Sequence, residues 1–210
     1  EEYWPAYKEA YRRIASKGLA VAAVSQQIID RIEPTGPHRV VPNGIEPVEW
    51  LGVPPPAPEW FAAIPRPRGV YVGTLDSRLD VRGLRTLATE RPDLQIVLIG
   101  TAPQPVALAE VRDLSNVHIH GRVGRRDVVA VLRNSDLCLL AHRRTPLTEA
   151  MSPLKVYEYL GAGRPVLATD FEPVRGLGAR VLLAESVADF VELVDLALGL
   201  GVELEPNRRA

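Results

Sequence analysis

Lys155 and Glu158 carry the strongest signal for chemistry in this sequence of 210 residues. They are three positions apart, so in a helix they share one face. Ser152 is a good N-cap and Pro153 a good first helical residue, so we expect a helix to begin there. Its N-terminus would expose unpaired amides and a partial positive charge, which suit a phosphate. A lysine in the first turn suits a diphosphate, and a carboxylate one turn later can accept hydrogen bonds from both hydroxyls of a ribose.

A simpler interpretation of the same pair is a surface salt bridge between Lys155 and Glu158, with Ser152 and Pro153 serving only as a helix start. Pairs at this spacing are common and stabilise a helix by roughly 0.2–0.5 kcal/mol. Periodicity alone favours this interpretation. Lys155 is, however, the only lysine after Lys17 in a chain that otherwise uses arginine, which supports a specific need for it.

Other reactive side chains give weaker signals. His118 and His120 face the same way on a predicted strand and could ligate a metal, but no third ligand is evident, so two half-exposed strand histidines are favoured. Cys138 lies inside a predicted strand, where a small buried core residue is expected. The sequence contains no dinucleotide-binding glycine motif after its first regular strand, no P-loop and no nucleophile elbow. It also lacks a D-x-D pair, which leaves lysine, arginine and helix N-termini to bind any diphosphate.

Composition excludes several other classes of protein. The 25 basic and 26 acidic residues give a net charge of -1, which argues against a nucleic-acid binder held by a basic surface. A single cysteine excludes a disulfide framework or a cysteine-rich zinc site. No apolar run approaches the roughly 18 residues of a membrane span, and no signal peptide is recognisable. We therefore expect a cytoplasmic protein with no nucleic-acid partner.

The elements that must position these residues follow from a regular pattern after residue 68. Short apolar runs predict strands at 69–73, 94–99, 117–119, 136–141, 165–169 and 180–183, and helical patterns fall at 81–90, 105–113, 125–134, 153–160 and 186–198. Continuous apolar runs are typical of a parallel sheet covered on both faces. The pattern therefore predicts an α/β fold with a Rossmann-like, doubly wound parallel sheet, which binds ligands beyond the carboxyl ends of its strands.

The chain before this region is organised differently. We expect a helix over 5–17, a strand over 19–24, a helix over 26–32 capped by Ser25, and a strand over 39–41. The prolines of 45–68 exclude a helix interior or a central strand and predict a stiff connector. Its aromatic residues, Trp50, Trp60 and Phe61, predict that the connector packs down on the domain.

The segment 151–169, which reads MSPLKVYEYLGAGRPVLAT, resembles the donor-nucleotide motif of GT-B glycosyltransferases of the retaining, family-4-like group, also called glycosyltransferase group 1. Segments 41–45, 71–75, 97–100, 116–123 and 136–140 resemble further parts of that family in the same order. The resemblance implies that the fold is one half of a GT-B fold. Residues 1–46 would be a remnant of the N-terminal domain, 47–68 a proline-rich linker, and 69–210 the C-terminal nucleotide-sugar-binding domain.

The resemblance also assigns roles to residues. Lys155 and Arg78 would be catalytic and would stabilise the leaving diphosphate, and Glu158 would bind the ribose hydroxyls. The residues expected to contact the donor nucleotide are Gly73, Thr74, Gly121, Arg122, Val123, Ser152, Pro153, Leu154, Lys155 and Glu158. The residues expected near the transferred sugar are Glu149, Ala150 and Met151.

One departure concerns the sugar. Many family members carry a glutamate eight positions before the ribose-binding one, and that position is Ala150 here, with Glu149 one place away. His142 and Arg143 are expected at the lip of the site or as structural residues.

The function implied is retaining transfer from a nucleotide sugar, a UDP- or GDP-sugar, to a glycan or lipid-linked acceptor in bacterial polysaccharide biosynthesis, with no metal or other cofactor. The acceptor would be held by a missing N-terminal domain, and the protein would be cytoplasmic or peripheral to the inner face of the membrane. This chain would be the donor-binding half, able to bind nucleotide but not to transfer a sugar by itself. Two alternatives are a nucleotide-sugar 2-epimerase, which would need further acid–base residues, and a non-catalytic nucleotide-sugar-binding module.

Overall fold

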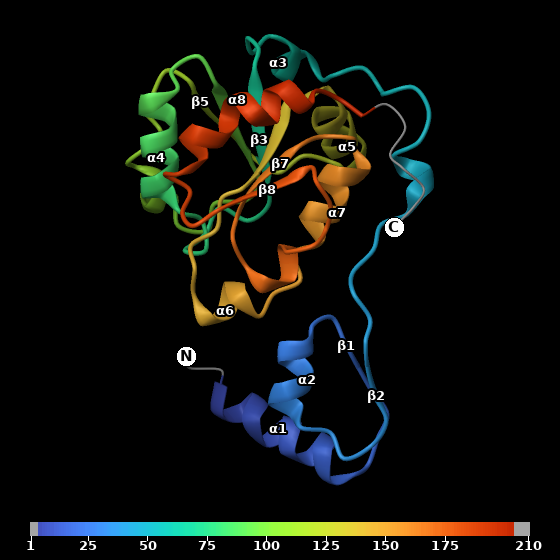
Figure 1. Ribbon diagram of the computed structural model, residues 1–210. Helices are drawn as coiled ribbons and strands as arrows, with labels where there is room; N and C mark the ends of the chain where they lie inside the picture. Colours follow the sequence, from blue (N-terminus) through green and yellow to red (C-terminus); the bar gives the residue numbers. More distant parts are fainter. Residues whose placement is uncertain (1–3, 204–210) are drawn as a thin grey trace.

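The computed structural model describes residues 4–203 as a six-stranded parallel sheet with helices on both faces, preceded by a small N-terminal unit (Figure 1). The strands of the large sheet are β3 (Arg68–Val72), β4 (Gln95–Ile99), β5 (Val117–His120), β6 (Leu137–Leu140), β7 (Val166–Thr169) and β8 (Val181–Ala184). They lie in the order β5-β4-β3-β6-β7-β8. This is the order of a Rossmann-like sheet, whose strand sequence reverses between its first and fourth strands. The predicted fold class is confirmed.

Five α-helices cover this sheet. They are α4 (Val81–Glu90), α5 (Arg125–Asn134), α6 (Pro146–Glu149), α7 (Leu154–Gly161) and α8 (Phe190–Leu200), with 3-10 turns η2 (Pro105–Leu108) and η3 (Glu172–Val174). In α4, the Asp80 side chain accepts a hydrogen bond from the Gly83 amide at the helix start. Leu84 and Leu87 then fall at helical spacing and are buried against the sheet. A polar cap and an apolar stripe thus fix both the start and the orientation of this helix.

Two predicted helices were wrong in their extent, and one helix that covers the sheet was missed. The helix expected over 105–113 is only the short turn η2, because Pro105 starts it and only Leu108 and Val111 are buried, too few for a continuous apolar stripe. The helix expected over 186–198 begins at Phe190, because the Asp189 carboxylate accepts from the Ser186 amide and hydroxyl and forms a turn there. Helix α6 was not predicted.

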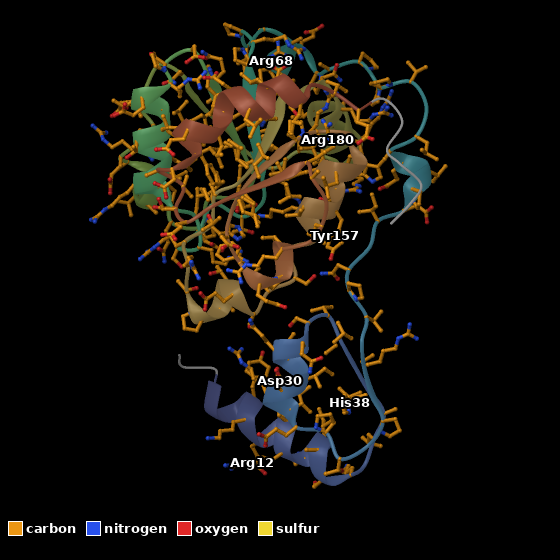
Figure 2. The ribbon with its side chains drawn as sticks, viewed as in Figure 1. Arg12, Asp30, His38, Arg68, Tyr157 and Arg180 are labelled. Atoms are coloured by element: carbon orange, nitrogen blue, oxygen red, sulfur yellow. The ribbon has the colours of Figure 1, made fainter. Side chains whose placement is uncertain are left out.

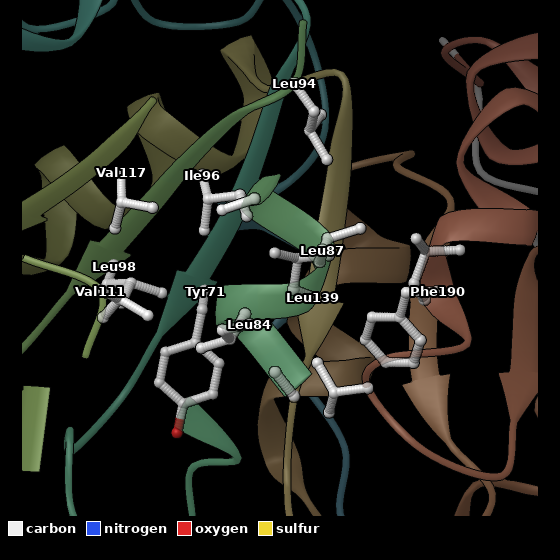
Figure 3. Close-up of a cluster of buried hydrophobic side chains, with 14 of the residues drawn as sticks. Tyr71, Leu84, Leu87, Leu94, Ile96, Leu98, Val111, Val117, Leu139 and Phe190 are labelled. Carbon is white, nitrogen blue, oxygen red and sulfur yellow. The ribbon is translucent and has the colours of Figure 1, made fainter. Parts of the chain in front are cut away.

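Two apolar clusters fill the two sides of the sheet. The cluster under α4 and α8 includes Tyr71, Leu84, Leu87, Ile96, Leu98, Leu139 and Phe190 (Figure 3). Tyr71 lies at one end of that cluster with its hydroxyl pointing away from the apolar side chains. The cluster under α5 and α7 includes Trp50, Phe61, Val97, Cys138 and Tyr159. Cys138 is fully buried, as predicted.

The N-terminal unit holds α1 (Trp4–Ser16), β1 (Val21–Ala23), α2 (Gln26–Ile32) and β2 (His38–Val40), with β1 and β2 paired in parallel. Figure 2 shows Asp30 and His38 in this unit and Arg68, which begins β3, at the far end of the sheet domain. The carboxyl ends of the strands therefore face the N-terminal unit. Two hydrogen bonds join the unit to the loop between α6 and α7, one from Ser25 and one from Asn43.

The proline-rich segment between the two units packs against the sheet domain. It contains η1 (Pro47–Glu49) and α3 (Glu59–Ala62), and its Trp50 and Phe61 are buried, as expected. Arg133 of α5 donates hydrogen bonds to the carbonyls of Leu51 and Gly52. No helix within residues 4–203 is both long and apolar enough to cross a membrane.

We expect Phe190→Ala to destabilise the domain by about 3–5 kcal/mol, because the Phe190 ring is fully buried between α8 and the sheet and its loss leaves a cavity. Urea denaturation would measure this change. Leu196→Ala on the same helix is the matched control, because Leu196 is 55% exposed, and should leave the midpoint nearly unchanged. Equal effects of the two substitutions would contradict the assignment of the core.

Candidate functional site

The site begins where two neighbouring strands part. β3 and β6 are paired only through Gly69 and Val70. Further along β3, the amide of Val72 donates to Tyr159 Oη of α7 at 3.0 Å instead of to a strand. This opening is the point at which the strand order reverses, and ligands of doubly wound sheets bind there.

Lys155 of α7 reaches across this opening. Its Nζ donates to Tyr71 Oη at 2.9 Å, lies 3.4 Å from His142 Nε2, and stands 4.1 Å from the centre of the Tyr71 ring. Tyr71 belongs to β3 and His142 follows β6, and both side chains are buried. Three elements thus meet around one amine, although Lys155 as a whole residue is only half-buried.

Little negative charge near Lys155 offsets the positive charge of its amine. Burial and, after it, the charge of Arg78 together lower the pKa of Lys155 to about 7, against the opposing effect of Asp76 and Glu158. Burial, and then the charges of Lys155 and Arg78, lower the pKa of His142 to about 3. His142 is therefore neutral at pH 7, and burial also raises the pKa of Tyr71. An anion placed beside Lys155 would supply the charge that these neutral neighbours lack.

Arg78 lies in the loop after β3 and belongs to the same charge cluster. Its guanidinium donates to Asp76 at 2.6 Å, and this hydrogen bond lowers the pKa of the Asp76 carboxyl. The loop is fastened to the end of β6, because the Arg78 carbonyl accepts from the Arg143 amide at 2.8 Å and the Asp80 amide donates to Ala141. The two residues predicted as catalytic, Lys155 and Arg78, are thus at one edge of the sheet.

Gly73 and Thr74, in the loop after β3, lie beside Lys155 and Tyr71. A Cβ on Gly73 would lie 2.5 Å from Lys155 Nζ, and the Thr74 carbonyl accepts from Tyr71 Oη at 3.2 Å. Gly100 approaches so closely that a Cβ there would lie 1.8 Å from the Gly73 carbonyl oxygen. Glycine at 100 is therefore required for the two loops to approach each other, and glycine at 73 leaves room for the Lys155 amine in its present position.

Glu158 does not pair with Lys155. Within the part of the chain that the structure describes, its Oε1 accepts from Nη1 of Arg125, and Lys155 turns to Tyr71 instead. The interpretation of Lys155 and Glu158 as a mutual surface salt bridge is therefore wrong. The two side chains leave one helix toward different partners at the same edge of the sheet.

The start of α7 differs from the prediction. The helix begins at Leu154 with Pro153 at the N-cap position, so Ser152 is not the N-cap. Proline has no side-chain acceptor, and no side chain caps this end. The Ser152 carbonyl instead accepts from Asn43 Nδ2 at 2.7 Å. Leu154, the first residue of the helix, is 46% exposed.

The loop before α7 contains the residues expected near a sugar. Glu149 ends α6 and pairs with Arg144 at 3.4 Å. Ala150 is buried, and its carbonyl accepts from Ser25 Oγ at 3.3 Å, although Ser25 had been expected to cap α2 with that oxygen. Met151 is half-buried. Among the described residues, no hydrogen bond or ion pair joins these three residues to Lys155.

The residues expected at the base lie in the loop that leaves β5. Gly121 and Arg122 are exposed, Val123 is half-buried, and Arg125 of the helix that follows reaches Glu158. His118 bonds Gln95 and His120 stacks on Trp60, so these two histidines have structural partners. Among the described residues there is no group of three or more histidine, cysteine, aspartate or glutamate side chains that could hold a metal.

Sequence reasoning missed three residues of the cluster. His142, expected at the lip of the site or as a structural residue, is 2% exposed and lies against Tyr71 and Lys155. Tyr71, Asp76 and Arg125 were not singled out. Tyr71 and Arg125 bind partners far away in the sequence, and Asp76 has only a local contact with Arg78. The position of Tyr71 before Gly73, at the end of the first buried strand, is the one signal that could have found it.

A family model described as "Glycosyl transferases group 1" matches residues 66–198, which is more than half of the chain. The chain belongs to this glycosyltransferase family. The matched segment starts just before β3 and ends within α8, so it contains the whole six-stranded sheet and the site at its carboxyl edge.

A protein of Bacillus subtilis described as a putative teichuronic acid biosynthesis glycosyltransferase, TuaH, is 26% identical over 102 residues, which are 48% of this chain and 26% of that protein. Sucrose-phosphate synthase from Thermosynechococcus elongatus has a TM-score of 0.71 at 18% identity, covering 94% of this chain and 54% of that one. HepE of Anabaena, in complex with UDP and glucose, has a TM-score of 0.70 at 16% identity, covering 93% of this chain and 58% of that one. The structural neighbours have a GT-B fold. This chain spans about half the length of these neighbours.

We expect the two charges beside Lys155 to move its pKa in opposite directions. Arg78→Ala should raise the pKa from about 7 toward the ordinary 10.5, and Asp76→Asn should lower it, because Arg78 disfavours the ammonium and Asp76 favours it. An NMR titration of the Lys155 side chain in the wild type and both variants would measure this. Shifts in the same direction would contradict the described cluster.

Proposed function

We propose that this glycosyltransferase domain binds the nucleotide-sugar donor at the opening between β3 and β6. The observation that carries the proposal is the Lys155 amine, held across that opening by neutral Tyr71 and His142 beside the first turn of α7. A cation with neutral partners at the ligand-binding edge of such a sheet suits a diphosphate.

In this proposal the diphosphate lies between Lys155, the unpaired amides at the start of α7 and the loop of Gly73 and Thr74. Lys155 binds an oxygen of the diphosphate. Arg78 gives up some of its hydrogen bonds to Asp76 and binds the second phosphate instead. Both cations act more strongly as the bond to the sugar breaks, because negative charge then grows on the leaving diphosphate. The proposal assigns this role to protein cations and a helix N-terminus rather than to a metal or other cofactor.

The nucleoside is assigned to the neighbouring elements. Glu158 accepts hydrogen bonds from the ribose hydroxyls, and the Gly121, Arg122 and Val123 segment lies against the base. Ser152, Pro153 and Leu154 form the wall at the helix start, and Glu149, Ala150 and Met151 form the side nearest the sugar. The support for this assignment is that all these residues belong to segments at the carboxyl edge of one sheet.

The structural neighbours are about twice as long as this chain. We further propose that the whole protein performs retaining transfer from a UDP- or GDP-sugar to a glycan or lipid-linked acceptor, which the other half of a GT-B fold holds. The HepE neighbour holds UDP and glucose, which supports a nucleotide-sugar donor. The Bacillus relative is described as acting in teichuronic acid biosynthesis, which supports a role in polysaccharide biosynthesis. We assign that role to the cytoplasmic side of the membrane.

Calorimetric titration of the chain with UDP and with GDP tests the donor site. One of the two nucleotides should bind, and Lys155→Ala should weaken that binding by about 10- to 100-fold, because one charge-assisted hydrogen bond to the diphosphate is lost. Affinity should also fall as the pH rises through about 7, since the neutral amine cannot attract the anion.

Lys17→Ala is the matched control, because Lys17 is exposed and lies in the N-terminal unit, far from the sheet edge. It should bind as the wild type does. Unchanged affinity of Lys155→Ala, with the variant folded, would contradict the assignment of the diphosphate to this amine.

A further inference from the structure

Arg125 joins three segments that are far apart in the sequence. It is the first residue of α5, directly after the loop that leaves β5, and its side chain contacts Glu49 of η1 and Glu158 of α7. Its guanidinium carbon lies 5.2 Å from the centre of the Trp50 ring. The proline-rich segment, the loop after β5 and α7 thus converge on one guanidinium.

The two carboxylates on Arg125 are held differently. Glu49 accepts from both Nε and Nη2, at 3.2 Å and 2.5 Å to its Oε2, which is a two-pronged contact. Glu158 accepts from Nη1 alone, through Oε1. A two-pronged arginine–carboxylate contact fixes direction as well as distance. The guanidinium is therefore anchored to the linker side, by Glu49 and by the Trp50 ring beneath it, and extends one N–H to Glu158.

Glu158 keeps acceptor capacity after this contact. A carboxylate offers about four lone-pair sites on two oxygens. Its Oε2 has no hydrogen-bond partner among the described residues. The side chain is only 14% exposed, so its carboxylate is confined to a narrow range of positions once Oε1 is held. Glu49 and Arg125 neutralise each other, so the charge that remains belongs to Glu158.

We propose that Arg125 is a positioning residue for ribose recognition: it fixes Glu158 through Oε1 and leaves the other lone pairs directed to the ribose hydroxyls. This inference rests on the proposed function of Glu158. A carboxylate that is already oriented loses less side-chain freedom when it binds, which raises affinity for a ligand with hydroxyls to donate. Arg125 thereby couples the ribose contact to the linker residue Glu49 and to the base-side loop.

Titration of the 210-residue chain with UDP and with 2′,3′-dideoxy-UDP, or with the guanosine pair where GDP is the nucleotide bound, separates positioning from general structure. The wild type should bind the ribonucleotide more tightly than the dideoxy nucleotide. Arg125→Ala should weaken ribonucleotide binding by about tenfold and leave dideoxynucleotide binding nearly unchanged. Arg125→Lys, which keeps one charged donor, should recover part of the loss.

Two further variants complete the test. Glu49→Gln should show a smaller loss confined to the ribonucleotide, because it removes the charge of the anchor while Arg125 and one acceptor oxygen remain. Arg126→Ala is the matched control, because Arg126 is the exposed neighbour with no contact to either glutamate, and should behave as the wild type. Thermal unfolding of each variant checks that it remains folded.

Several results would overturn the inference. Unchanged or tighter ribonucleotide binding by Arg125→Ala would show that Arg125 does not position Glu158 or that it competes with the ribose. Equal losses for both nucleotides would show a general structural role, and equal wild-type affinities would remove the ribose contact itself. Binding of neither nucleotide by the wild type would instead overturn the proposed function, and this inference with it.

Discussion

The hydrogen-bond ladder between β3 and β6 ends early, and the rest of the site depends on that opening. The two strands pair only near their amino ends, because the order of the sheet reverses there and the chain leaves them in opposite directions. The amide of Val72 would be unpaired in a partly buried position, at a cost of up to about 1–3 kcal/mol, if Tyr159 did not accept from it. This bond fastens α7 to the sheet and so determines where Lys155 and Glu158 emerge from the helix.

The electrostatics follow from that placement. Lys155 stands over the opening with neutral hydrogen-bond partners, and Asp76, the carboxylate that most raises its pKa, is already paired with Arg78. Its burial therefore has an electrostatic cost in the empty site, and an anionic ligand would offset it. Glu158 is held by Arg125 instead, so one short helix presents a cation and an oriented acceptor to the same edge of the sheet.

The sequence allowed the sheet to be predicted well, because continuous apolar runs such as Leu137–Leu140 are required wherever a parallel sheet is covered on both faces. Lys155 and Glu158 could be picked out because they are local to one helix and belong to a motif with a known order of parts. Their partners could not be inferred in this way. Tyr71, His142 and Arg125 meet them only through the fold, and the Ser152 carbonyl is likewise engaged by Asn43, far away in the sequence.

A crystal structure of the chain with a bound nucleoside diphosphate tests the central claim most directly, because the claim is geometric. The account predicts that the diphosphate lies within hydrogen-bond distance of Lys155 Nζ and of the amides at the start of α7, with the ribose hydroxyls on Glu158. In that structure the amine should have turned from His142 toward the phosphate. A nucleotide bound away from the opening between β3 and β6, with Lys155 still on Tyr71 and His142, would contradict it.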